Sequence, residues 1–151
     1  MPHPTDVPPS VLLPRLAQEL QSRKAVNPPE WASFVRTGVH TQNAPYQRDW
    51  WYLRSASVLR KLYIRGARGV ERLSAEYGGS RDRGSAPYHA RSGSRSIARE
   101  ILQQLEGAGL VRKQKNGGRA LTSDGHRLLD QLAKELLKAL AAKDTQLAKY
   151  L

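Results

Sequence analysis

The hydrophobic positions of the chain predict a mostly helical protein. Apolar residues recur at steps of three and four in several segments, as they do where one face of an α-helix is buried. Leu13, Leu16, Ala17 and Leu20 form such a stripe near the start of the chain. Segments of this kind predict helices over residues 10–23, 49–66, 69–77, 94–106 and 122–140.

A further short helix is predicted over residues 28–38. Asn27 is a good capping residue, the two prolines after it suit a first helical turn, and Glu30 stands where a capping box has its carboxylate. We expect the apolar side chains of this helix to be buried, namely Trp31, Val35 and Phe34.

Three segments lack a helical or strand period. Residues 1–9 are rich in proline, and residues 39–47 form a polar connector. Residues 79–94 are rich in Gly, Ser and Arg, and they predict a basic loop that is flexible without its partner. In residues 110–121, by contrast, Asn116-Gly117 suits a tight turn and predicts a β-hairpin.

These elements predict a mainly α fold in a single domain over residues 1–151. The order of the helices and the hairpin is winged-helix-like: a helical bundle around a central long helix, with one short β-hairpin as the wing. In a winged helix, the helix before the hairpin meets nucleic acid and the hairpin flanks it. The segment 79–94 departs from a compact winged helix, which joins its helices tightly.

The central helix, residues 49–66, carries two different faces. Its apolar stripe consists of Tyr52, Ala56, Leu59 and Tyr63. A second, basic stripe follows the same helical steps and continues beyond the helix; its members are Trp50, Arg54, Ser57, Lys61, Arg65 and Arg68. We therefore expect the helix to touch both the core and a ligand. Trp50 either stacks on a base or holds the basic side chains in place.

The charge of the chain points to a polyanionic partner. The chain has 25 Lys and Arg against 13 Asp and Glu, a net charge of +12. Most of the excess lies between Arg48 and Arg119, where thirteen of the sixteen basic residues are Arg. The Arg guanidinium pairs with phosphate in a planar fork and stacks on bases, so this composition favours a specific nucleic-acid contact.

The sequence offers little for catalysis, metals or membranes. Cysteine is absent, the four His residues lie far apart, and no phosphate-binding GxxxxGK[ST] motif occurs. We therefore expect no enzyme activity, metal or cofactor. No apolar run approaches the ~20 residues of a membrane span, and the N-terminus lacks the pattern of a secretory signal. We expect a cytoplasmic protein that is a monomer when isolated.

Four segments resemble one family of ribosomal proteins. They are PPEWASFVRTG (28–38), APYQRDWWYLRSASVLRKLYIRGARGVERLSAEYGG (44–79), SIAREILQQLEGAGLV (96–111) and NGGRALTSDGHRLLDQLA (116–133). In this order and spacing they resemble the small-subunit ribosomal protein S19e family of archaea and eukaryotes. The resemblance implies a helical protein in the head of the small subunit, bound to ribosomal RNA beside other ribosomal proteins, and active in maturation of that subunit.

The basic stripes and the resemblance together select candidate RNA-binding residues. They lie on the central helix, in the loop after Gly78-Gly79, on the next helix and on the hairpin. The candidates are Trp50, Arg54, Arg60, Lys61, Arg65, Arg68, Arg81, Arg83, Arg91, Arg95, Arg99, Lys113 and Arg119.

One alternative function belongs to a different class. A winged-helix regulator that binds DNA would use the same helix and hairpin, with the Leu-rich last helix as a dimer seam. The spread of Arg over at least four elements favours folded RNA over a single DNA groove.

Overall fold

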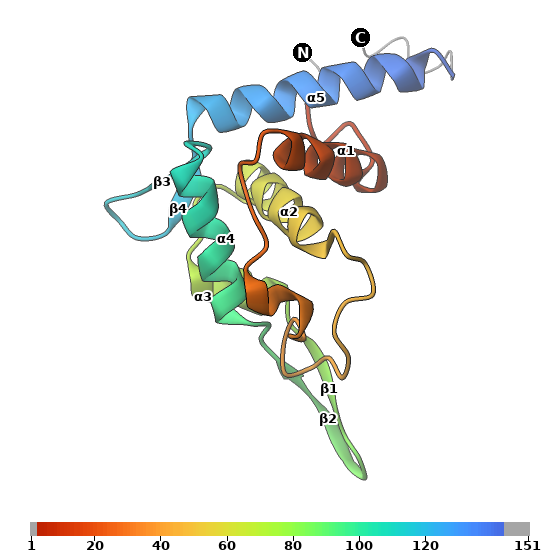
Figure 1. The fold of residues 1–151 in the computed structure, drawn as a ribbon, viewed down its shortest axis with the longest axis vertical. Coiled ribbons are helices and arrows are strands. Elements are labelled where there is room, and N and C mark those ends of the chain that lie inside the picture. Colours follow the sequence, from red (N-terminus) through yellow and green to blue (C-terminus); the bar gives the residue numbers. More distant parts are fainter. Residues whose placement is uncertain (1–2, 144–151) are drawn as a thin grey trace.

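The protein is described here from a computed structural model, which describes residues 3–143. The single domain predicted over 1–151 also includes residues 1–2 and 144–151, which lie outside the described residues. The fold is mainly α and winged-helix-like, as predicted. Its elements, shown in Figure 1, are α1 (Pro9–Ser22), a short 3-10 helix η1 (Glu30–Ser33), α2 (Trp50–Arg65), α3 (Val70–Glu76), β1 (Gly79–Arg83), β2 (Ala86–Arg91), α4 (Arg95–Gly107), β3 (Val111–Lys113), β4 (Arg119–Leu121) and α5 (Ser123–Ala141).

Helix α1 packs against both α2 and α5. Three members of the predicted stripe are buried, namely Leu16, Ala17 and Leu20. The fourth, Leu13, is only half-buried, and Leu12 is buried in its place. Pro9 occupies the first turn, where a missing N–H costs no hydrogen bond. The segment before the helix is irregular, as predicted, but Val7 is fully buried, so this segment belongs to the core.

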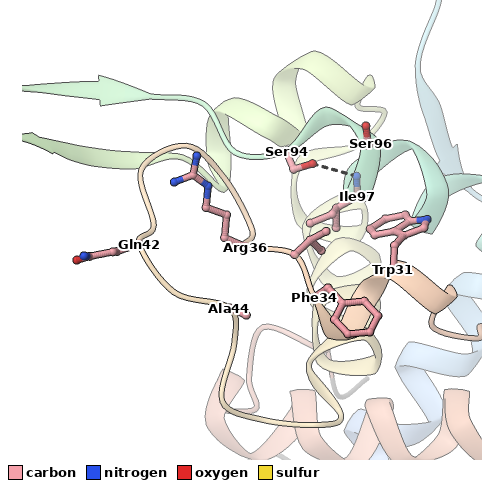
Figure 2. A pocket seen from close by; sticks show the side chains of 9 residues that line it. Trp31, Phe34, Arg36, Gln42, Ala44, Ser94, Ser96 and Ile97 are labelled. Atoms are coloured by element: carbon pink, nitrogen blue, oxygen red, sulfur yellow. Dashed lines mark hydrogen bonds between the residues drawn. The ribbon is translucent and has the colours of Figure 1, made fainter.

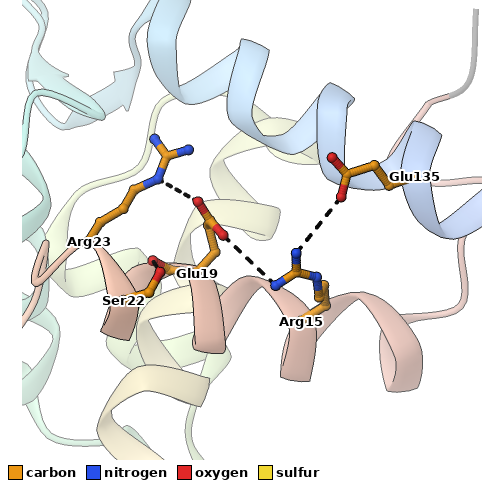
Figure 3. A network of polar contacts seen from close by, with 5 residues as sticks. All are labelled: Arg15, Glu19, Ser22, Arg23 and Glu135. Carbon is orange, nitrogen blue, oxygen red and sulfur yellow. Dashed lines mark hydrogen bonds and ion pairs between the residues drawn. The ribbon is translucent and has the colours of Figure 1, made fainter.

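Ion pairs link α1 to α5 at the surface. Arg23 Nε donates to Glu19 Oε1 at 2.7 Å, and Arg15 lies 3.8 Å from Glu19 and 3.9 Å from Glu135 of α5 (Figure 3). Exposed pairs of this kind contribute at most about 1 kcal/mol each. The buried leucines of the two helices therefore hold this interface together, and the ion pairs only border it.

Helix α2 runs through the middle of the core. Trp51, Val58, Leu59 and Leu62 are almost completely buried. The Tyr63 hydroxyl, near the end of the helix, donates a hydrogen bond to Asp130 Oδ1 of α5 at 2.7 Å. Burial and this hydrogen bond raise the pKa of Tyr63 to about 12.

The winged-helix unit follows α2. Helices α3 and α4 pack together, and β3 and β4 form the antiparallel wing predicted over residues 110–121. Its turn uses glycines at positive φ, 87° at Gly117 and 81° at Gly118. Arg68 and Arg119 exchange two backbone hydrogen bonds of 2.9 Å, which tie the chain between α2 and α3 to the edge of the wing.

The prediction for residues 79–94 is wrong in its secondary structure. Strands β1 and β2 form a second antiparallel hairpin, which projects from the end of the molecule opposite α5 (Figure 1). Gly84 reverses the chain at φ 70°, and its N–H donates to Asp82 Oδ1 at 2.8 Å. Almost all side chains of this hairpin are exposed or half-exposed, so neither face is apolar and the sequence shows no alternation.

The prediction of a helix over residues 28–38 is also wrong. Only η1 is helical there, and its one fully buried side chain is Ala32. Two of the three side chains predicted to be buried are exposed, Trp31 to 37% and Phe34 to 84%. After η1 the chain crosses toward the base of the β1–β2 hairpin, where Ser94 N–H donates to the Thr37 carbonyl at 2.9 Å.

None of the helices within residues 3–143 has the length and apolar character that a membrane span requires.

Candidate nucleic-acid interface

The basic stripe of α2 converges on a single carboxylate, that of Glu76 at the end of α3. Lys61 Nζ donates to Glu76 Oε2 at 3.0 Å, and Glu76 Oε1 lies 3.4 Å from Arg65 and 3.8 Å from Arg68. Partial burial by itself would raise the pKa of Glu76, but the hydrogen bond from Lys61 and the three positive charges lower it below its usual range. Glu76 is therefore an anion that holds three cations close together.

Arg54 does not lie on an open surface as the stripe predicts. Its guanidinium lies over the ring of Tyr77, 4.1 Å from the ring centroid, and Lys61 lies over the same ring at 4.5 Å. Burial lowers the pKa of Arg54, although Tyr77 acts in the opposite direction. The Tyr77 hydroxyl donates to Ser57 Oγ at 2.7 Å and so fixes the ring that both cations use. Arg54 is half-buried and packed in place.

Trp50 is a packed residue in this structure. Its ring is buried and meets Trp51 edge to face, with centroids 5.3 Å apart. Of the two interpretations of Trp50, the structure favours the one in which it supports the basic side chains, because only 9% of the residue is exposed. Trp50 and Arg54 line the same shallow cleft of about 330 Å³ beside Tyr77.

Arg60 lies on α2 outside the basic stripe and enters the candidate set only through the family resemblance. It is half-buried, and its Nε is buried with no hydrogen-bond partner among residues 3–143. A buried donor without an acceptor carries a free-energy cost that a bound anion would remove.

The hairpin β1–β2 carries three candidates, Arg81, Arg83 and Arg91. Arg83 donates to the Pro87 carbonyl at 3.2 Å and Arg91 to the Ala90 carbonyl at 3.1 Å. Among the described residues, none of the three forms an ion pair with a carboxylate. The hairpin therefore presents its positive charge to solvent.

The remaining candidates lie on α4 and the wing. Arg99 is exposed and has no ion-pair partner in the described part of the chain, whereas Arg95 lies 3.3 Å from Glu71 in an exposed pair. On the wing, Arg119 Nε donates to Glu106 at 2.9 Å, and Lys113 lies 3.8 Å from the same carboxylate.

Apart from Arg95, whose pair with Glu71 is exposed, the candidates fall into two groups. Those of α2 and the wing are packed or paired within the protein, and those of the hairpin and Arg99 are open. The candidate set omits further basic residues that are exposed and have no ion-pair partner within residues 3–143. They include Arg36 and Arg48 on the segment before α2, Arg72 on α3, Arg112 on β3 and Lys115 in the turn of the wing, and no helical stripe joins them.

Comparison with known proteins decides the family. The family model described as ribosomal protein S19e matches residues 3–139. The small ribosomal subunit protein eS19 of Thermoplasma volcanium is 48% identical over 145 residues, 96% of each chain. That of Aeropyrum pernix is 45% identical over 148 residues, 97% of each chain, and that of Mya arenaria is 47% identical over 108 residues, 72% of each chain. The chain belongs to the ribosomal protein S19e family.

Membership of the S19e family confirms the resemblance seen in the four sequence segments. It also places the chain in a family of ribosomal proteins that have a structural role and are not enzymes. In this S19e chain, the segment WWYLRSAS begins α2 and the segment LYIRG ends it, with Gly66 at φ 71° as the first residue past the helix. The family motifs thus build the helix on which the packed group of cations lies.

Proposed function

We propose that this S19e chain is a structural constituent of the small ribosomal subunit that binds ribosomal RNA in the subunit head. It supports assembly and maturation of that subunit, in contact with neighbouring ribosomal proteins. The observation that carries the proposal is the family match over residues 3–139. It is joined by an Arg-rich hairpin whose three arginines form no ion pair with a carboxylate among residues 3–143.

The two groups of cations suit different tasks in RNA binding. The packed group around Glu76 and Tyr77 is fixed before RNA arrives, so little side-chain entropy is lost on binding. The open hairpin reaches away from the body and can follow a phosphate backbone. RNA phosphates would contact the hairpin and Arg99 first, and the packed group would fix the register.

The proposal is tested by incorporation into small subunits that lack this protein. The test variant changes Arg81, Arg83 and Arg91 to Gln, and the control changes three exposed lysines of the opposite end, Lys134, Lys138 and Lys143, to Gln. Both variants lose three charges. We expect the wild type and the control to co-sediment with the subunits at moderate salt and the hairpin variant to remain largely unbound. Failure of the wild type to co-sediment would contradict the proposal.

Family membership favours this function over a DNA-binding regulator. The hairpin β1–β2 between α3 and α4 also separates the two helices that a compact helix-turn-helix joins directly.

A further inference from the structure

A cleft of about 720 Å³ lies beside η1, away from the packed cations of α2. One wall is η1 with the chain that follows it to Ala44, and the other is the first turn of α4 (Figure 2). Its volume falls within the range of roughly 300–1,000 Å³ that is typical of small-ligand sites. None of the candidate RNA-binding residues lines it.

Two aromatic rings define the apolar part of the cleft. Phe34 is 84% exposed, and its backbone N–H donates to the Trp31 carbonyl at 3.1 Å, which fixes the backbone that carries the ring. Trp31 is 37% exposed and meets the buried Trp51 edge to face at 5.6 Å. Trp51 Nε1 in turn donates to Gln104 Oε1 at 3.1 Å, and this hydrogen bond holds in place the ring that Trp31 contacts.

The rest of the cleft is polar and positive. Among residues 3–143, Arg36 is the one charged residue that lines it, and no carboxylate does. Arg36 donates to the Thr41 carbonyl at 3.3 Å, a contact that leaves its charge uncompensated. Ser94 and Ser96 add hydroxyl groups on the α4 side; Ser94 Oγ accepts from Ile97 N–H, and its own proton remains available to a ligand (Figure 2).

We propose that this cleft binds an unpaired nucleobase of RNA, stacked on Phe34 and Trp31, with Arg36 on an adjoining phosphate. The inference rests on the proposed function, because it supposes an RNA partner, and it adds a base-binding site to a surface otherwise made of phosphate contacts. Aromatic rings stack on any base, and hydroxyl groups at the rim can bond the edge of the base.

Charge favours RNA over a protein segment as the occupant. The cleft lies in a chain of net charge +12, and the charged side chain in its lining, Arg36, is positive. The nucleotide therefore matches both parts of the site, the base against the rings and an adjoining phosphate against Arg36.

The test uses a short single-stranded RNA of cytidines with one 2-aminopurine, whose fluorescence is quenched when it stacks on an aromatic ring. The variant is Phe34→Leu, which keeps an apolar side chain and removes the ring. The control is Tyr46→Leu, which removes another exposed aromatic that lies outside both the cleft and the β1–β2 hairpin. Both positions are exposed, so both variants should melt with the wild type.

We expect the wild type and Tyr46→Leu to quench the probe alike. Phe34→Leu should lose most of the quenching and bind about tenfold more weakly, because loss of one stacked base has an effect of this order. Equal quenching and affinity in Phe34→Leu and the wild type would overturn the inference while the proposed function stands. Normal RNA binding by Phe34→Leu with lost subunit incorporation would assign the cleft to a protein neighbour and overturn it too. No quenching by the wild type would also overturn the inference, whereas failure of the wild type to enter small subunits would contradict the proposed function itself.

Discussion

At the scale of single residues, Glu76 organises the basic surface. One carboxylate lies within ion-pair distance of Lys61, Arg65 and Arg68, which otherwise would repel one another. Removing the carboxylate leaves three neighbouring cations without compensation. Glu76 therefore contributes to folding stability, and in the proposed RNA complex it would compete with phosphate for the same side chains.

Glu76→Gln should reduce the free energy of unfolding by about 1–2 kcal/mol at neutral pH, since hydrogen bonds to charged groups contribute on this scale. The pKa of Glu76 is lowered in the folded state, so its contribution is complete above the ordinary value of 4.5 and is lost as the pH falls through the lowered pKa. Urea unfolding of the wild type and the variant should show a constant difference from pH 7 down to about pH 5 and a shrinking one below.

The control for this prediction is Glu71→Gln, because Glu71 and Arg95 form an exposed pair. It should change the free energy of unfolding by less than about 1 kcal/mol. A difference for Glu76→Gln that persists unchanged at acid pH would show that the ion pairs are not its cause.

Substitutions at Arg54 and Leu59 compare two kinds of side-chain packing on helix α2. Arg54→Ala removes a cation lying over the Tyr77 ring and should reduce the free energy of unfolding by about 1 kcal/mol. Leu59→Ala empties a fully buried site and should cost ~2–5 kcal/mol. Thermal melting of both variants measures the difference, and equal melting temperatures would contradict the assignment of Arg54 to a partly exposed contact.

Sequence reasoning identified the residue types of this surface but not their partners. A helical stripe shows that Arg54, Lys61 and Arg65 share one side of α2. It does not show that Glu76 and Tyr77 come from α3 to meet them, because that depends on the turn between the helices. The prediction that Phe34 is buried was wrong for a related reason. Hydrophobic side chains are buried on average, but this ring borders an open cleft.

At the scale of elements, the two hairpins differ in what holds them. The wing β3–β4 begins at the buried Val111 and ends at the buried Leu121, and it bonds to Arg68 at its edge. Beyond its base, the hairpin β1–β2 is held by its own ladder and its turn, and residues 36–42 border one side of it across a small cleft. Two-stranded hairpins with little further support are marginally stable. The wing was predictable from Asn116-Gly117 between apolar residues, whereas β1–β2 has no buried face from which to predict it.

Shortening the hairpin β1–β2 should therefore weaken RNA binding while it leaves the stability of the fold almost unchanged. Joining Ser80 to Ala90 by Asn-Gly keeps the first two register pairs of the ladder and removes the tip with Arg81 and Arg83. We expect a melting temperature within about 2–4 °C of the wild type, because less than about 1 kcal/mol should be lost. Binding to small-subunit RNA should fall strongly. A large fall in melting temperature would show that the hairpin is part of the folding unit.

Backbone dynamics of the same hairpin give a second expectation. Amide hydrogens near Gly84 should exchange much faster than those of α4 in the absence of RNA, because the tip contains no buried apolar side chain. Hydrogen exchange with and without RNA measures this, and protection should rise when RNA binds. Protection of the free hairpin equal to that of α4 would refute its independence from the core.

At the scale of the whole molecule, charge and apolar packing are separated along the chain. Helices α1 and α5 meet through buried leucines at one end, and the Arg-bearing hairpin projects from the other (Figure 1). The sequence predicted this asymmetry, because sixteen of the twenty-five Lys and Arg fall between Arg48 and Arg119. It did not predict which cations are paired inside the protein, since ion pairs depend on tertiary contacts.

The salt dependence of binding to small-subunit ribosomal RNA tests the central claim most directly. If about six phosphates are neutralised, the slope of log affinity against log salt should be near −4 to −5. The variant with Arg81, Arg83 and Arg91 changed to Gln should have a slope smaller in magnitude by about 2 to 3, and the Lys134, Lys138 and Lys143 control should keep that of the wild type. A slope near zero for the wild type, or equal slopes for the two triple variants, would contradict an RNA interface built on the Arg-rich hairpin.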